Sequence, residues 1–475
     1  MVEYKILNCK NIEFNKRLDP EYYKKDYILI DQIIANFDTT LLRYVARITD
    51  GDHDKRNYTS NGMLFLRSQD IFEYGIIIKE PVYISSETAK KLIRSKPENY
   101  DVLMTKTGNI GASVVFDKRY VPESNISADI SLIRIINTKI NPYFLVIYLN
   151  SGYGRKYVYR LMSGSGRPRV TLNNIKNLKI PILKESFQKK IEEISKFIYK
   201  YNYESLSLIN NKLKDINSSY SQLLNTSRII YHIDSVSSVT INHRMDAEFY
   251  NIFYVNILNK IKEAKYSFIK LLDCASLIGL DFDSSKHPNT YFNYIELSDI
   301  DQNLGIITNS TKLLGKELPS RAKRILKEND IIISSVEGSL DKVAIVDKLN
   351  DGAIASNGFI QLRSTGIKPE VLLLLAKSII LQSQLRRYST GTILTSVNSN
   401  AVKNFIIPVL YEGKQDSLSS DVKKSHELRR KAINLLELAK GAVEIAIEEN
   451  EDKAIEYLKE NLQNSGDFNG KALFS

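Results

Sequence analysis

The stretch MSGSGRPRVTLNNIKNLKIPIL, from Met162 to Leu183, decides the fold because its pattern returns later as YSTGTILTSVNSNAVKNFIIPVL, from Tyr388 to Leu410. Each passage contains a glycine loop, an amide-rich turn and an apolar strand that ends in Ile-Pro. The second halves align without a gap, so that Pro181 matches Pro408 at an offset of 227 residues (408 − 181 = 227). A repeat of this kind determines the architecture before any local feature does.

Further echoes occur upstream in the same order. Arg134, in ISADISLIRI, matches Arg363, in ASNGFIQLRS. The other echoes pair LDPEYY with MDAEFY (Leu18–Tyr23 and Met245–Tyr250) and YDVLMTKTGNIGASVVFD with NDIIISSVEGSLDKVAIVD (Tyr100–Asp117 and Asn329–Asp347). Ordered echoes at nearly one offset predict a tandem duplication. Short β-branched runs separated by Gly, Asn, Asp and Ser turns indicate that each copy is a mixed α/β domain.

The length and composition fit a globular protein with two domains. The chain has 475 residues, of which 43% are hydrophobic and 25% are charged, as is usual for globular proteins. No apolar run approaches the ~18 residues of a membrane span, and the first residues lack the apolar core of a signal peptide. Two cysteines, Cys9 and Cys274, cannot build a disulfide framework. We therefore expect a cytoplasmic protein that does not enter a membrane.

Apolar residues at coiled-coil spacing follow each copy of the repeat. Phe187, Ile191, Ile194, Ile198 and Tyr201 are spaced 4, 3, 4 and 3 residues apart, and an alanine-rich seam runs from Leu428 to Ala446. Neither helix can bury its stripe alone, so the sequence predicts that the two helices pair as an antiparallel coiled coil. The alternative is that each helix covers only its own domain.

The predicted fold class is α+β, with two similar mixed α/β domains that are each followed by a long helix. The predicted segments are a first domain (1–183), a central long helix (184–228), a second domain (229–410), a distal long helix (411–464) and a flexible tail (465–475).

No catalytic motif is visible in the sequence. An adenine methyltransferase needs an Asp/Asn-Pro-Pro-aromatic loop, whereas NPYF (Asn141–Phe144) has one proline and fits a helix start. There is no phosphate-binding loop of the P-loop or dinucleotide type. The histidines and cysteines do not cluster at metal-ligand spacing. A duplicated basic chain without a catalyst, of net charge +11, suits the reading of two separated segments of one polyanion.

The ordered pattern resembles the specificity subunit of type I restriction-modification systems. A further similarity is the passage DGDHDKRNYTSNGMLFLRSQDI, from Asp50 to Ile71. The resemblance implies two target-recognition domains that read a bipartite, gapped site in double-stranded DNA. It also implies long helices on which methyltransferase (modification) subunits dock, and an association with restriction subunits. No cofactor is expected on this chain, because S-adenosylmethionine, Mg and ATP would bind to the partner subunits.

The candidate DNA-binding residues lie in basic or polar loops. Positive charge without acidic residues fills the segment 153–171, with a weaker version near residue 388, and Ser, Asn and Glu side chains in turns can contact base edges. A solvated surface or a plain turn is the alternative for each. The resemblance adds Asp52 and His53. The candidates are Asp52, His53, Lys106, Thr107, Asn109, Arg155, Lys156, Arg160, Ser165, Arg167, Arg169, Lys286, His287, Arg321, Lys323, Arg324, Ser335, Glu337, Arg386, Arg387, Tyr388 and Thr392.

Two other functions remain open from the residues alone. The chain could be a divergent adenine DNA methyltransferase, or the recognition part of one. It could also be a sequence-specific DNA-binding protein of another phage-defence complex.

Overall fold

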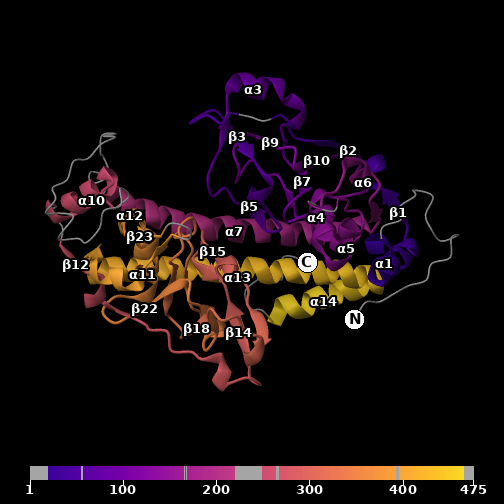
Figure 1. Cartoon of the computed structure of the whole chain (residues 1–475). Coiled ribbons are helices and arrows are strands. Elements are labelled where there is room, and N and C mark those ends of the chain that lie inside the picture. Colours follow the sequence, from indigo (N-terminus) through magenta and orange to yellow (C-terminus); the bar gives the residue numbers. More distant parts are fainter. Residues whose placement is uncertain are drawn as a thin grey trace. The chain divides into compact units, whose positions relative to one another are not determined.

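The computed structural model describes residues 20–54, 57–164, 166, 168–219, 249–263, 267–391 and 395–464 (Figure 1). The chain divides into two units. Unit 1 contains residues 1–203 and 428–475, and unit 2 contains residues 204–427. Each unit therefore combines a mixed α/β part with a portion of two long helices.

Unit 1 is built on a four-stranded antiparallel sheet in the order β2-β10-β7-β8. Strands β7 and β8 are buried along their whole length, as their Val- and Leu-rich sequences favour. A second sheet, β6-β3-β9, contains a parallel β3–β9 pair, and β1-β11 and β4-β5 are two-stranded. The strands are β1 (Thr39–Leu41), β2 (Ala46–Asp50), β3 (Met63–Leu66), β4 (Ile71–Phe72), β5 (Gly75–Ile76), β6 (Tyr83–Ile84), β7 (Val102–Thr105), β8 (Ser113–Val115), β9 (Ser124–Ile126), β10 (Ile130–Ile135) and β11 (Lys179–Pro181). The helices of this part are α1 (Lys25–Ala35), α2 (Leu42–Val45), α3 (Ser86–Lys91), α4 (Pro142–Asn150), α5 (Gly152–Arg160) and α6 (Leu172–Lys176).

Unit 2 repeats this plan. Its antiparallel sheet has the order β13-β22-β19-β20, and its second sheet, β17-β14-β21-β18, contains a parallel β14–β21 pair. The strands are β12 (Phe268–Lys270), β13 (Ala275–Leu277), β14 (Tyr291–Ile295), β15 (Ile300–Asp301), β16 (Ile306–Ile307), β17 (Thr311–Leu314), β18 (Ala322–Ile325), β19 (Ile331–Ser334), β20 (Val343–Ile345), β21 (Ile354–Ser356), β22 (Phe359–Ser364), β23 (Ser389–Thr390), β24 (Ser396–Val397) and β25 (Ile406–Pro408). The helices are α10 (Ile252–Glu263), α11 (Pro369–Lys377) and α12 (Ile379–Arg387).

One ion pair, between a buried aspartate and a half-buried arginine, occurs at the same place in both units. Arg134 donates two hydrogen bonds to Asp101 at 2.9 and 2.7 Å, and Arg363 donates two to Asp330 at 2.7 and 2.9 Å. The residue before each aspartate has a left-handed backbone, with φ 71° at Tyr100 and 70° at its counterpart in unit 2. Such a conformation is uncommon outside glycine. The match between Arg134 and Arg363 therefore extends from sequence to bond geometry.

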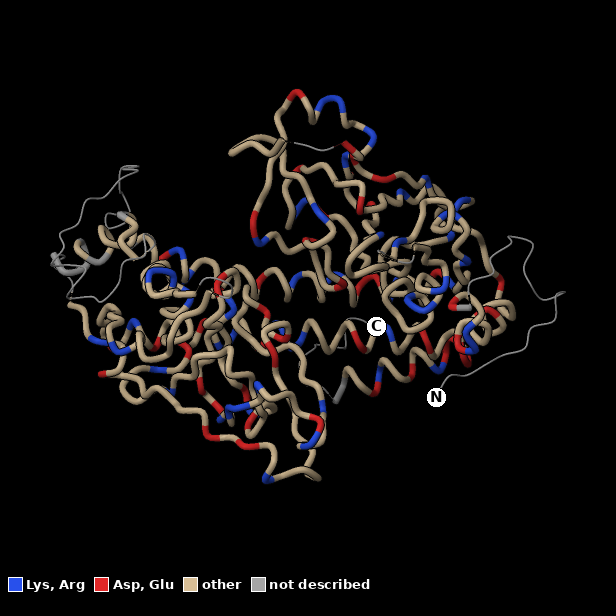
Figure 2. Tube along the Cα trace, in the orientation of Figure 1, with Lys and Arg blue, Asp and Glu red and all other residues tan. Residues whose placement is uncertain are grey.

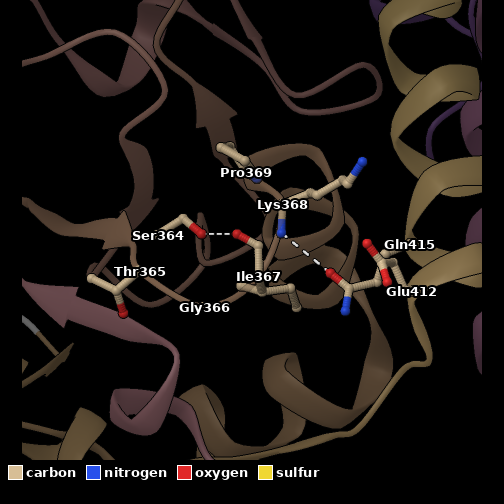
Figure 3. A pocket seen from close by; sticks show the side chains of 8 residues that line it. All are labelled: Ser364, Thr365, Gly366, Ile367, Lys368, Pro369, Glu412 and Gln415. Atoms are coloured by element: carbon tan, nitrogen blue, oxygen red, sulfur yellow. Dashed lines mark hydrogen bonds between the residues drawn. The ribbon is translucent and has the colours of Figure 1, made fainter.

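A glutamine amide ties the start of each long helix to the α/β part before it. Gln188 accepts the backbone N–H of Asn141 at 2.8 Å and donates to the carbonyl of Leu183 at 2.8 Å. In unit 2, Gln415 accepts the backbone N–H of Lys368 at 3.3 Å and donates to the carbonyl of Leu410 at 2.9 Å. Figure 3 shows the Lys368–Gln415 bond beside a pocket of about 560 Å³. The joint is the same in both copies.

The helix start expected at Asn141 is confirmed, and the segment up to Met162 forms two helices. Helix α4 ends at Asn150 and α5 begins at Gly152, with Ser151 between them. The Ser151 side chain accepts the N–H of Gly154 and so caps the second helix. A Cβ on Gly154 would lie 2.0 Å from the carbonyl oxygen of Tyr148, so this tight turn requires glycine.

The predicted long helices are present, with one correction. Helix α7 spans Glu185–Ser219, and residues 220–228 lie outside the described part of the chain. The sequence predicts one helix over 411–464, but α13 (Glu412–Glu448) ends and α14 (Glu451–Asn464) begins anew. The side chain of Asn450 accepts the N–H of Lys453 at 2.9 Å and caps α14. Among the described residues, no helix is long and apolar enough to cross a membrane.

The predicted seam positions lie in the cores of the units. In unit 1, Phe187, Ile191 and Ile194 are fully buried in one cluster with Ala439 and Ala442. The small alanines allow neighbouring elements to approach closely, as the packing of interiors requires. Portions of both long helices are thus part of the hydrophobic core of unit 1.

Candidate nucleic-acid interface

Helix α5 carries the first half of the predicted basic segment, and two of its arginines point inward. Arg155 is 9% exposed and pairs with Glu73, and Arg160 is 5% exposed and pairs with Asp31. A buried cation requires such a partner, since an uncompensated one is costly. Their assignment to a DNA-facing surface is therefore corrected, because both serve the interior of unit 1. Lys156 is exposed and remains a candidate.

The glycine loop after α5 is closed by two backbone hydrogen bonds. The N–H of Ser163 donates to the carbonyl of Arg169 at 3.0 Å, and the reverse bond is also 3.0 Å long. The Arg169 side chain is exposed, and the N–H of Val170 donates to the carbonyl of Lys106 at 3.2 Å. The other two candidates of this loop, Ser165 and Arg167, lie outside the described residues.

The candidates His53 and Lys106 come together on the carboxylate of Asp50, at the end of β2. Lys106 Nζ and His53 Nε2 each lie 2.8 Å from Asp50 Oδ2, and Arg94 Nη2 lies 3.8 Å from Oδ1. Burial opposes ionisation of Asp50, but the hydrogen bonds and charges of Lys106 and His53 outweigh it and hold its pKa below the usual range. The side chains of Lys106 and Asp50 are only 11% and 7% exposed, whereas those of His53 and Arg94 are 64% and 72% exposed. Two of the three basic groups therefore face solvent.

The turn after β7 holds two more candidates with different exposure. Thr107 is buried, and its hydroxyl has no hydrogen-bond partner among the described residues. Asn109 is exposed, and Gly108 between them has φ 69°, a conformation that suits glycine. Asp52 is half-buried, and its backbone forms an isolated parallel β-bridge with Ser127. Asn109 is thus the accessible polar side chain of this turn.

The corresponding turn of unit 2 is one residue longer between the paired strands and has a serine where unit 1 has Lys106. Ser335, which corresponds to Lys106, donates its hydroxyl to the carbonyl of Gly358 at 2.8 Å and is 8% exposed. Glu337 is exposed, and its N–H donates to the carbonyl of Thr395 at 2.9 Å. Ser335 therefore belongs to the interior of unit 2, and Glu337 faces solvent.

Strand register identifies the counterpart of Asp50. Ile48 pairs with Ile133, and Leu277 pairs with Leu362. Because Arg134 and Arg363 occupy equivalent positions, Leu277 corresponds to Ile48, and Gly279 corresponds to Asp50. The buried pair of Asp50 and Lys106 in unit 1 is thus replaced by Gly279 and Ser335 in unit 2. Both charges are absent together, as expected when either alone would be uncompensated.

An arginine approaches this strand end in both units. Arg324 comes six residues before Asp330, and Arg94 comes seven residues before Asp101. Arg324 is 3% exposed and donates to the carbonyls of Ile278 and Gly279 at 2.9 and 3.3 Å. Burial lowers the pKa of this guanidinium. Arg324 is therefore a buried structural side chain rather than an exposed one.

The remaining candidates of this part of unit 2 are exposed or half-buried. Lys286 and His287 are exposed, and the His287 ring lies 6.3 Å from the ring of Phe282. Arg321 is exposed but pairs with Glu296 at 2.6 Å. Lys323 is half-buried. The role of these side chains as DNA contacts stays a prediction.

The second basic cluster lies at the end of α12. Arg386 is exposed. Arg387 donates to the carbonyl of Phe249 at 3.0 Å, and its guanidinium lies 4.3 Å from the centre of that ring. Tyr388 packs edge-on against Phe249 at 5.4 Å, and Thr392 lies outside the described residues. Arg386 is the accessible cation of this group.

Sequence reasoning missed a basic surface at α3 and the turn after it. The segment KKLIRSK, residues 90–96, places Lys90, Lys91 and Arg94 at exposed positions, and Figure 2 shows basic residues along this part of unit 1. Lys91 pairs with Glu87 at 2.8 Å. The four cations in seven residues were a detectable signal. Their position beside Asp50 was not, because it depends on the register of β2.

The described side chains offer hydrogen-bonding and cationic groups rather than a metal centre. Among them, no group of three or more His, Cys, Asp or Glu residues could hold a metal ion. Exposed cations next to polar turns can bind a polyanion and contact polar edges, but they do not by themselves break covalent bonds.

Comparison with known proteins gives one family match. Residues 55–229 match the model described as the type I restriction modification DNA specificity domain. No curated protein matches the chain by sequence.

Three solved structures are similar to long stretches of the chain. The S subunit of a type I restriction-modification system from M. genitalium is 13% identical, with 89% of this chain and 96% of that chain covered and a TM-score of 0.37. A structure from a study of complex assembly and conformational transition of the type I R-M system is 14% identical, with coverages of 87% and 98% and a TM-score of 0.30. The HsdS subunit from Thermoanaerobacter tengcongensis is 14% identical, with coverages of 87% and 97% and a TM-score of 0.29.

Proposed function

Because residues 55–229 match the model of the type I restriction modification DNA specificity domain, we propose that the chain is a DNA-sequence specificity subunit. Each unit reads one part of a bipartite, gapped site in double-stranded DNA, and the chain performs no catalysis itself. The family match covers the first copy only. The duplication carries the proposal to the second copy, since the main sheets of both units share one strand order and both units contain the same Arg–Asp ion pair.

The exposed side chains of the two units differ, which supports the proposal that each unit recognises a different DNA sequence. The first unit has a charged group around Asp50 where the second has Gly279 and Ser335. The exposed side chains of the matching turns are Asn109 and Glu337. An amide can pair with adenine, and a carboxylate can accept from the amino group of cytosine. Two units with the same fold but different exposed turn residues can recognise the two different halves of an asymmetric DNA site.

We further propose that the long helices pair as an antiparallel coiled coil. Within unit 2, Ser205 and Ser425 exchange hydrogen bonds of 2.8 Å between side chain and backbone, and Lys212 pairs with Asp421 at 3.0 Å. From the first contact to the second, the residue number rises along α7 (205 to 212) and falls along α13 (425 to 421), which supports an antiparallel arrangement. A polar pair within such a seam favours one register over others.

The catalytic steps are assigned to partner subunits. Methyltransferase subunits would dock on the long helices, and restriction subunits would join them. S-adenosylmethionine, Mg and ATP would bind to those partners. Support for a non-catalytic role is the family match, together with the lack of an adenine-methyltransferase loop in the sequence.

Methylome sequencing of a host that expresses the chain with its modification subunits tests the proposal. We expect a gapped motif with two specified parts that disappears when this chain is omitted. Methyl transfer by the purified chain alone, with S-adenosylmethionine and genomic DNA, would contradict the non-catalytic role. A continuous motif without a gap would contradict the assignment of one half-site to each unit.

A further inference from the structure

Arg94, which lies near the end of β2, differs from Arg324 of unit 2 in its exposure and in its partners. Arg94 is 72% exposed at its side chain, and its nearest carboxylate oxygen, on Asp50, is 3.8 Å away. That distance is longer than a hydrogen bond. In the described part of unit 1, no other carboxylate pairs with Arg94. Its guanidinium donors therefore remain available to a ligand.

The charges around Arg94 leave a positive surface. Lys106 already neutralises Asp50 through a 2.8 Å bond that is almost fully shielded from solvent. The charge of Arg94 is consequently not cancelled by that carboxylate. Lys90 is exposed on the neighbouring helix, and His53 lies on the other side of Asp50 at 64% exposure. The ordinary partner of such a surface on a DNA-binding protein is a phosphate.

In the described part of unit 2, neither arginine near the equivalent strand end has a free guanidinium. Arg324 is buried, and its guanidinium donates hydrogen bonds to the carbonyls of Ile278 and Gly279. Arg321 is exposed, but Glu296 neutralises it at 2.6 Å. The two copies thus keep an arginine at the same strand end, with its charge outward in one copy and inward in the other.

We propose that Arg94 contacts a DNA phosphate and that this contact anchors the first unit with no counterpart in the second. The inference rests on the proposed function. It adds that the two units divide their tasks unequally, because the first supplies sequence-independent affinity at this strand end and the second does not. A phosphate rather than a base edge is favoured because the side chain is exposed and only loosely held. Reading a base requires a side chain fixed by its neighbours.

The salt dependence of DNA binding tests the proposal. The specificity subunit, assembled with its modification subunits, is titrated into a fluorescein-labelled duplex that carries the motif found by methylome sequencing. A second duplex of unrelated sequence is titrated in parallel. Arg94→Ala should make the slope of log K against log salt shallower by about 0.9 for one lost phosphate contact. The change should be the same for both duplexes, because a phosphate contact carries no sequence information.

Two further variants complete the design. Arg94→Lys keeps the charge and should keep the slope. Arg119→Ala removes an exposed arginine of the same unit that Asp117 already holds through both carboxylate oxygens, and it should leave the slope unchanged.

An unchanged slope in Arg94→Ala would overturn the proposal. So would a loss confined to the cognate duplex with relaxed preference at one base pair, which would make Arg94 a base-reading residue. A slope that changes equally in Arg119→Ala would show that any exposed arginine has this effect. If the unsubstituted assembly shows no site-specific binding, the proposed function fails, and this inference fails with it.

Discussion

Removing the buried pair of Asp50 and Lys106 one charge at a time should destabilise unit 1 much more than removing both. The two groups are 2.8 Å apart, with side chains 7% and 11% exposed. Deleting one partner of a buried pair leaves an uncompensated charge, which typically costs about 3–5 kcal/mol. Replacing both by neutral side chains of similar volume is often close to neutral. We therefore expect strong coupling in a double-mutant cycle of Asp50→Asn and Lys106→Met.

The structure also predicts that the two single variants differ. In Lys106→Met, the carboxylate of Asp50 keeps His53 at 2.8 Å and Arg94 at 3.8 Å, so its cost should lie near ~3 kcal/mol, the lower end of that range. In Asp50→Asn, Lys106 retains no carboxylate among the described residues. Its cost should approach ~5 kcal/mol. The double variant should lie within ~1 kcal/mol of the unsubstituted chain.

Hydrogen exchange measured by mass spectrometry can resolve these effects locally. Peptides that cover β7 and β10 report on the sheet of the pair, and those that cover β19 and β22 provide a control within the same chain. A cost of ~3 kcal/mol should speed exchange in the first set by about 100-fold. Costs that simply add in the double variant would refute the reasoning. Equal acceleration in the control peptides would show that the substitution acts on the whole chain rather than on this pair.

Three further predictions concern pH, spacing and modularity. Burial lowers the pKa of His426 below its ordinary 6.5, against the opposing hydrogen bond to Leu304; since the unfolded side chain then protonates first, the protection of unit 2 amides, corrected for the intrinsic exchange rate at each pH, should fall as the pH drops below about 6.5, and His426→Gln should reduce this loss of protection. Inserting one heptad after Asn211 and another after Lys423 lengthens both helices by ~10.5 Å; the unspecified gap of the methylated motif should grow by about three base pairs at ~3.4 Å each, and an unchanged gap would show that the helices do not set the spacing. Exchanging residues 20–183 for those of a relative should change one half of the motif, and a change in both halves would contradict independent reading.

The sequence predicts the duplicated frame well because repeated residues preserve repeated contacts. The match of Arg134 with Arg363 is confirmed down to paired hydrogen bonds with Asp101 and Asp330. Periodicity likewise locates α7, since the apolar stripe of a helix can be read directly from spacing. The break between α13 and α14 was harder to predict, because the cap at Asn450 lies within an otherwise helical pattern.

The candidate surface could be predicted only in part. Arg155 and Arg160 appear in the sequence as a basic run, yet Glu73 and Asp31, far away along the chain, draw them into the interior. Local charge patterns carry no information about such distant partners. Arg94 was overlooked for the converse reason, because its exposure beside Asp50 follows from the register of a strand more than forty residues earlier.

The contrast between the inherited and the replaced ion pairs bears on how the copies diverged. Asp101–Arg134 has an equivalent in unit 2, whereas Asp50–Lys106 has been exchanged for Gly279 and Ser335. A lineage that changed these positions one at a time would pass through an ancestor with a single buried charge, which selection for stability disfavours. Strong epistasis of this kind makes stepwise drift between the two surfaces slow. Exchange of a whole domain crosses the same distance without visiting the unstable intermediate, so recombination is the easier evolutionary route to a new surface.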